Sequence, residues 1–220
     1  MYTTLMGVAA GTALIVLVLL GVELHKGKVT TFGGWALGLA VPGLLLAVTG
    51  LHMTLTQSIK LEGEVFKNSI FGELSAAFGV LALAAAFYLW RRGEPLLARP
   101  DLVDHLYVIA RPASIMVFGL GLGLLACTIG AFDYQIFATA PQAEPIMGTW
   151  PKWLVNTGLS SLLALPAVGA LLAPVAIWRA NRRLLGIAGA AFFAAGVGWV
   201  LTGALVYYTH IAMDFNLRAG

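Results

Sequence analysis

The chain has 220 residues, of which 60% are hydrophobic and only 10% are charged. A soluble domain carries about 25% charged residues, because its surface must meet water. The composition therefore excludes a soluble globular protein and predicts a surface that mostly contacts lipid. The net charge of +3 does not indicate nucleic-acid binding, because the basic residues form short clusters between apolar runs. The single cysteine, Cys127, excludes an intramolecular disulfide and every Cys-x-x-Cys motif.

Apolar runs of about 20 residues are needed to cross a bilayer core as helices. The first such run lacks a preceding basic stretch and is longer than the core of a signal peptide, so we interpret it as an uncleaved span. We predict an all-α, polytopic membrane protein with six transmembrane helices in a single domain, residues 1–220. The predicted spans are residues 4–24, 33–56, 70–90, 106–131, 153–178 and 184–212.

The distribution of Lys and Arg predicts the orientation. Nine of these residues fall on one side of the membrane: Lys26, Lys28, Arg91, Arg92, Arg99, Arg111, Arg179, Arg182 and Arg183. Four fall on the other side: Lys60, Lys67, Lys152 and Arg218. Because Lys and Arg are retained in the cytoplasm, the first side is expected to be cytoplasmic. Both termini are then extracytoplasmic, and the expected location is the cell membrane.

The four histidines lie at the ends of predicted spans. His52 and His210 lie at the outer ends of the second and sixth spans, and His25 and His105 lie at inner ends. Two histidines at each face suit a two-haem electron-transfer protein, since haem iron takes axial ligands from His or Met on facing helices. The simpler interpretation is that a histidine is amphipathic and stable at the interface. It applies most strongly to the inner pair.

The outer pair has further candidate ligands around it. Met53 follows His52, and Met213 lies three residues after His210 on the same helix face. His and Met together also suit copper, because thioethers select Cu(I). Glu73 opens the third span, where an ionisable group is a functional candidate by default. A third possibility is a quinone site, in which a histidine donates a hydrogen bond and a carboxylate accepts a proton.

We therefore predict that His52, His210 and Glu73 bind a cofactor, with His52, His210, Met53 and Met213 as the possible metal ligands. Each has a simpler interpretation as well. Both methionines can be apolar filler, and the carboxylate of Glu73 can be one favoured by the helix dipole.

The sequence lacks the motifs of hydrolases and ATPases, among them G-x-x-x-x-G-K-[ST], H-E-x-x-H and G-x-S-x-G. We predict no catalytic residue. The leading hypothesis is a redox-associated membrane subunit that holds haem b, copper or quinone near the outer face. The alternatives are a small transporter or channel in which Glu73 and Asp214 line a polar path, and a purely structural or assembly subunit. Expected partners are the lipid bilayer and either other membrane-complex subunits or further copies of the chain.

Several of these segments also resemble a known family. They are the His-Met end of the second span, the Phe-Gly-Glu start of the third (residues 71–73) and the YYTHIAMDF close of the sixth. Together they are similar to an uncharacterised family of prokaryotic integral membrane proteins, a domain of unknown function. Members carry a Trp-Pro turn and a Tyr-Asn pair before Phe-Gly-Glu, whereas this chain has QSIKLEGEVFKNS with Asn68 alone. The resemblance implies a fold and no mechanism.

Overall fold

The computed structural model describes residues 3–60, 65–138 and 145–219, with the side chains of residues 214 and 216–219 excepted. Within these ranges the chain is helical and contains no β-strand. Six helices are long and apolar enough to cross a membrane, which confirms the predicted fold class. The elements are α1 (Thr3–His25), α2 (Gly33–Thr56), the π-helix η1 (Asn68–Glu73), α3 (Leu74–Leu97), α4 (Leu102–Asp133), the 3-10 helix η2 (Met147–Thr149), α5 (Lys152–Trp178) and α6 (Arg182–Ala219).

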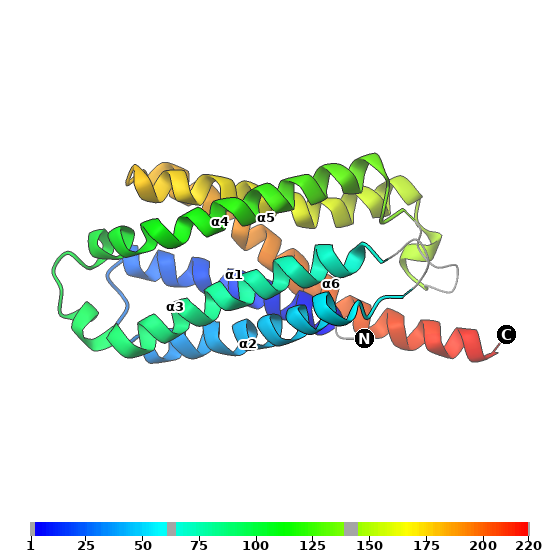
Figure 1. Ribbon diagram of the computed structural model, residues 1–220, viewed down its shortest axis with the longest axis horizontal. Coiled ribbons are helices and arrows are strands. Elements are labelled where there is room, and N and C mark those ends of the chain that lie inside the picture. Colours follow the sequence, from blue (N-terminus) through cyan, green and yellow to red (C-terminus); the bar gives the residue numbers. More distant parts are fainter. Residues whose placement is uncertain (1–2, 61–64, 139–144, 220) are drawn as a thin grey trace.

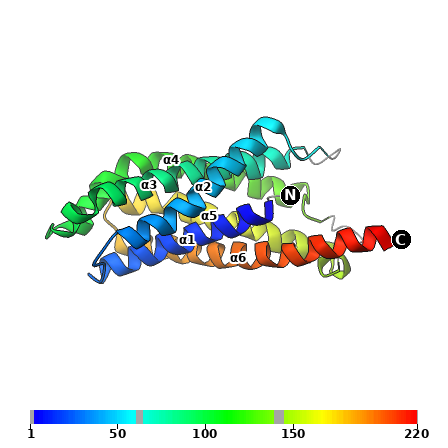
Figure 2. The same cartoon turned by 90° about the horizontal axis from the view of Figure 1, so that it is seen from below.

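The helices run along the long axis of the molecule (Figure 1). Each packs on the next in the order α3, α2, α1, α6, α5, α4, and a weaker contact between α3 and α4 closes the ring. The first and last helices are therefore neighbours, with α6 beside α1 (Figure 2). The N- and C-terminal ends lie at the same end of the bundle.

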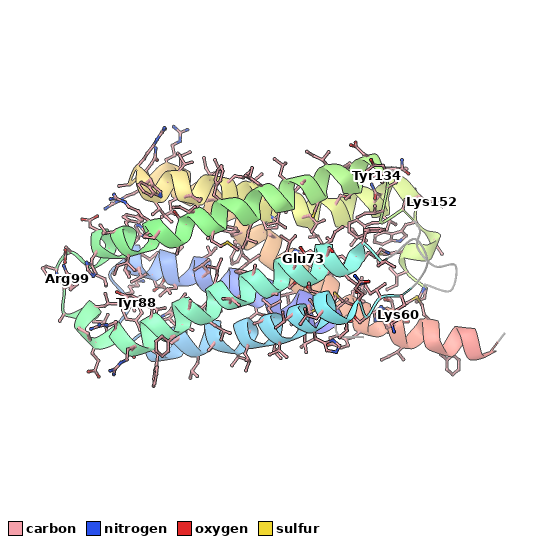
Figure 3. All side chains as sticks on the ribbon, in the orientation of Figure 1. Lys60, Glu73, Tyr88, Arg99, Tyr134 and Lys152 are labelled. Carbon is pink, nitrogen blue, oxygen red and sulfur yellow. The ribbon has the colours of Figure 1, made fainter. Side chains whose placement is uncertain are left out.

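Three basic residues, one from the first predicted group and two from the second, lie at the ends of the bundle that the prediction gives them. Arg99 lies at one end of the bundle, and Lys60 and Lys152 lie at the other (Figure 3). We call the first the basic end and the second, where both termini lie, the terminal end. The assignment of the basic end to the cytoplasm stays a prediction.

Three helices extend beyond the predicted spans. α3 continues to Leu97, α4 begins at Leu102, and α6 continues to Ala219, whereas the predicted limits were 90, 106 and 212. The physical reason is that hydropathy detects the part of a helix that lies in lipid. A helix satisfies its own backbone hydrogen bonds, so it continues into water where the side chains become polar.

Glycines allow the closest helix contacts. On α2, Gly50 lies against η1 and α3, where an added Cβ atom would stand 2.7 Å from the Gly72 carbonyl oxygen. On α1, Gly11 lies against the Gly196 carbonyl of α6. The sequence contains three Gly-x-x-x-Gly patterns, which begin at Gly7, Gly34 and Gly119. Only in the first do both glycines lie against the backbone of another helix, and the contact at Gly7 is of ordinary van der Waals length. Gly34 and Gly119 have nothing within 4 Å of an added Cβ atom.

Away from these contacts the bundle presents apolar side chains outward. Large hydrophobic residues remain exposed on every long helix, for example Leu37 at 67% and Ile115 at 65%. Such a surface is unstable in water but matches the lipid tails of a bilayer. The structure therefore supports a multi-pass membrane protein in direct contact with lipid.

We expect Gly50→Ala to lower the free energy of unfolding by about 1–3 kcal/mol, the usual cost of overpacking. The added methyl group would lie 2.5 Å from the Ala76 backbone nitrogen, so α2 and α3 must separate. Gly34→Ala, which adds the same group to open space on the same helix, is the control. Unfolding of the purified protein by SDS titration measures both. Equal stability of the two variants would contradict the proposed role of this glycine.

Candidate functional site

The loop between α2 and α3 is held by one buried amide. Asn68 is 2% exposed. Its side-chain Oδ1 accepts a hydrogen bond from the Ile59 backbone N–H at 2.9 Å. Its Nδ2 donates to the carbonyl oxygens of Ile59 at 2.8 Å and Val65 at 2.9 Å. Asn68 thus links the backbone of Ile59 to that of Val65 across the loop, and it stands at the start of η1.

Asn156 does the same for the second loop at the terminal end. It lies on α5, is 4% exposed, and its Oδ1 accepts a hydrogen bond from the Phe137 backbone N–H at 3.1 Å. Phe137 then lies against Phe71 of η1, with 6.3 Å between the ring centroids. Trp199 of α6 contacts the same Phe71 ring edge-on at 6.5 Å. Aromatic rings from three parts of the chain therefore meet near the terminal end.

The π-helix η1 determines where Glu73 lies. π-Helical turns are rare and occur frequently at functional sites. Gly72 places this turn directly against α2, since an added Cβ atom would lie 2.7 Å from the Thr54 hydroxyl. Glu73 follows, on the exposed side of the helix. It lies in the region between α3 and α4 (Figure 3), and the neighbouring Leu74 side chain would lie 3.4 Å from a Cβ atom added at Gly123 of α4.

Glu73 lies near the boundary of the lipid core. At a rise of 1.5 Å per residue it is about 27 Å along the helix from Arg91, the first basic residue at the far end of α3. The hydrocarbon core is about 30 Å thick. With Arg91 at one headgroup layer, Glu73 stands just inside the other. α3 and α4 are also the least closely packed pair of neighbours in the ring.

His52 and Met53 point in different directions. His52 is exposed, whereas Met53 is 1% exposed and packs in a core cluster with Met6, Ala9 and Leu46. Consecutive residues on an α-helix are about 100° apart, so only one of the pair can face the interior. Met53 thus has the apolar surroundings of a core residue, which its simpler interpretation predicted.

His210 lies beside the start of α1. The side chain is half-buried, and its Nδ1 lies 3.5 Å from the Thr4 hydroxyl oxygen. Met213, one turn further along α6, is also half-buried. α1 lies between α2 and α6 (Figure 2), so the helices that carry His52 and His210 are not neighbours. The structure therefore associates His210 with Thr4, and it places Glu73 next to the part of α3 that approaches α4.

A metal cluster is not apparent in the described part of the chain. Within residues 3–60, 65–138 and 145–219 there is no group of three or more His, Cys, Asp or Glu side chains that could hold a metal ion. The side chain of Asp214, which the alternative transporter hypothesis uses, lies outside the described residues.

At the basic end, both ring nitrogens of His25 have partners. Nδ1 donates to the Gly21 carbonyl at 2.8 Å, and Nε2 accepts from the Tyr107 hydroxyl at 2.8 Å. This tautomer ties the end of α1 to α4. The arrangement suits the structural interpretation of His25, because a haem ligand needs one ring nitrogen for the iron.

Sequence reasoning gave no role to Asn68, Asn156, Thr4 or Tyr107. One signal was available for the two asparagines. A carboxamide inside or next to an apolar run must be hydrogen-bonded when it is buried, so such a residue predicts a loop anchor. No sequence signal identified Thr4 or Tyr107, because each contacts a histidine that is distant along the chain.

Comparison with known proteins identifies a family whose function is unknown. Residues 1–213 match the model of a family described as a protein of unknown function (DUF981), and the chain belongs to that family. No curated protein and no solved structure matches the chain.

We expect Asn68→Ala to lower the free energy of unfolding by about 2 kcal/mol or more, because the partner groups of a buried amide lose their hydrogen bonds. Ser161→Ala is the control, since it removes one hydroxyl group that is exposed on α5 and bonded to the Thr157 carbonyl. SDS titration of the two purified variants measures the difference. If Asn68→Ala is no less stable than Ser161→Ala, Asn68 does not anchor the loop.

Proposed function

We propose that this member of the DUF981 family is a redox-associated membrane subunit that holds a quinone head group at Glu73. The observation that carries the proposal is the position of that residue. Glu73 is an exposed carboxyl group inside a transmembrane span, at the end of a π-helix. It lies near the contact between α3 and α4, which we call the seam and which is the weakest contact between neighbouring helices of the ring. Burial of charge in lipid is costly, so an ionisable side chain at this depth is a functional candidate.

The chemistry of a carboxyl group suits a quinone. A protonated Glu73 can donate a hydrogen bond to a quinone carbonyl, and an ionised Glu73 can accept a proton from a hydroquinone. Glu73 is exposed at the weak contact between α3 and α4, and in the proposal a lipid-soluble quinone reaches it there from the bilayer. The aromatic ring of Phe71 lies on the same π-helical turn and continues into the cluster with Phe137 and Trp199.

The arrangement of the histidines favours quinone over the other two cofactors. Haem or copper bound by both His52 and His210 would need ligands from α2 and α6, and α1 lies between these helices. A quinone at Glu73 needs neither histidine as a metal ligand. In the proposal His210, with its Thr4 contact, stays at the terminal end of the bundle as a polar group near the headgroups.

We expect the purified protein to bind a decyl-substituted quinone, with quenching of tryptophan fluorescence as the measurement. Glu73→Gln should weaken this binding about tenfold, the loss expected for a hydrogen bond to a charged group. Glu94→Gln is the matched control, because it makes the same change at an exposed position near the other end of α3. Equal affinities for both variants and the unchanged protein would contradict a site at Glu73.

Two further measurements separate this proposal from its rivals. We expect no haem α-band in the dithionite-reduced minus oxidised spectrum. A band that disappears in His52→Ala or His210→Ala would instead establish the haem hypothesis. Flux into proteoliposomes that depends on Glu73, without quinone binding, would establish the transporter hypothesis.

A further inference from the structure

A groove with arginines at its mouth lies on the lipid-facing surface at the basic end. It is an open depression of about 340 Å³ between α4 and α5. Ile115, Phe118, Pro174 and Val175 form its apolar walls, and Ser114, Trp178 and Arg179 complete the lining. The groove is remote from Glu73 and the outer histidines, so the proposed function does not involve it.

The Trp178 side chain lines the groove and is held in place by a hydrogen bond. Its indole N–H donates a hydrogen bond to the Ser114 hydroxyl at 3.1 Å, and that hydroxyl donates to the Arg111 carbonyl oxygen at 2.7 Å. Ser114 is 2% exposed, whereas Trp178 is 54% exposed. The hydrogen bonds therefore lock α5 to α4 while one face of the indole remains open.

Arg111 lies over the Trp178 side chain without an ionic partner. Its guanidinium carbon is 5.8 Å from the centroid of the Trp178 ring. The Nε atom is buried and has no hydrogen-bond acceptor. Among the residues that the structure describes, neither Arg111 nor Arg179 belongs to an ion pair. The Arg111 side chain as a whole is only half-buried, so part of it is accessible from the surface, and its unpaired positive charge favours an anion there.

The depth of the two arginines matches that of a phosphate layer. Arg111 is about 33 Å along α4 from Asp133, at 1.5 Å per residue, and the hydrocarbon core is about 30 Å thick. Arg179 is the first residue after α5 and lines the same groove. Both guanidinium groups thus stand at headgroup level, with the apolar walls directed toward the tails.

We propose that this groove binds an anionic phospholipid. The phosphate diester would lie between Arg111 and Arg179, and an acyl chain would lie along Ile115, Phe118 and Val175. Guanidinium groups match phosphate oxygens in geometry and charge. Basic pockets between transmembrane helices are known to take anionic head groups. A second groove, between α1 and α2, has a similar volume but no basic side chain in its lining, so it lacks this selectivity.

Native mass spectrometry of the full chain in a neutral detergent tests the proposal. We expect phosphatidylglycerol to bind at least fivefold more tightly than phosphatidylcholine, and the preference to decrease as salt is added. Arg111→Gln with Arg179→Gln should weaken phosphatidylglycerol binding by about tenfold or more. Arg91→Gln with Arg92→Gln is the matched control, with two exposed arginines removed at the same end of the bundle, and it should stay within about twofold of the unchanged protein.

Measurements on the unchanged protein and on a groove-filling variant test the proposal even if the Arg111 and Arg179 double variant fails to fold. Equal binding of the two lipids by the unchanged protein would overturn the proposal. So would a loss in the Arg91 and Arg92 control as large as that in the Arg111 and Arg179 variant. Competition by millimolar inorganic phosphate or glycerol 3-phosphate would assign the arginines to a soluble anion instead. Ile115→Trp, which fills the groove and keeps both arginines, should lower lipid binding, and unchanged binding would also count against the site.

Discussion

The satisfaction of backbone hydrogen bonds inside lipid is the constraint on which the structure depends. A bilayer supplies no water to unpaired N–H and C=O groups, so the chain must provide every partner itself. Six long helices do this over most of the length. Where the helices stop at the terminal end, Asn68 and Asn156 provide side-chain partners for the two loops. The π-helix and Glu73 follow directly from the first of these anchors.

Hydropathy predicted the six helices because the thickness of the bilayer determines the length of an apolar run. It did not predict that α3 reaches Leu97 or that α6 reaches Ala219, because a helix in water has no such length limit. The spacing of glycines along the sequence does not indicate which of them lie at the closest helix contacts. Gly50 makes one of the closest contacts in the bundle although it belongs to no Gly-x-x-x-Gly pattern, whereas Gly34 and Gly119 face open space.

The arrangement of the candidate site depends on which way each side chain faces and on the order of the helices around the ring. Neither can be deduced from residue spacing alone. His52 and Met53 are adjacent in sequence, yet one is exposed and the other is buried in the core. His52 and His210 were grouped because both end an outward-running span, but the order of helices around the ring separates them. Glu73 was identified correctly as an ionisable group within a span. The seam that it occupies could not be predicted, because contact between α3 and α4 is a property of the assembled ring.

The pairing of α1 with α6 has a consequence for biosynthesis. α6 leaves the ribosome after the other five helices, so the face of α1 around Gly7 and Gly11 is not covered by α6 until that helix has been made. During that interval the small residues of this face of α1 are exposed. Closure of the ring is therefore a late, long-range event. A chain that stops before α6 would keep this surface uncovered, and uncovered surfaces make incompletely folded chains prone to misassembly.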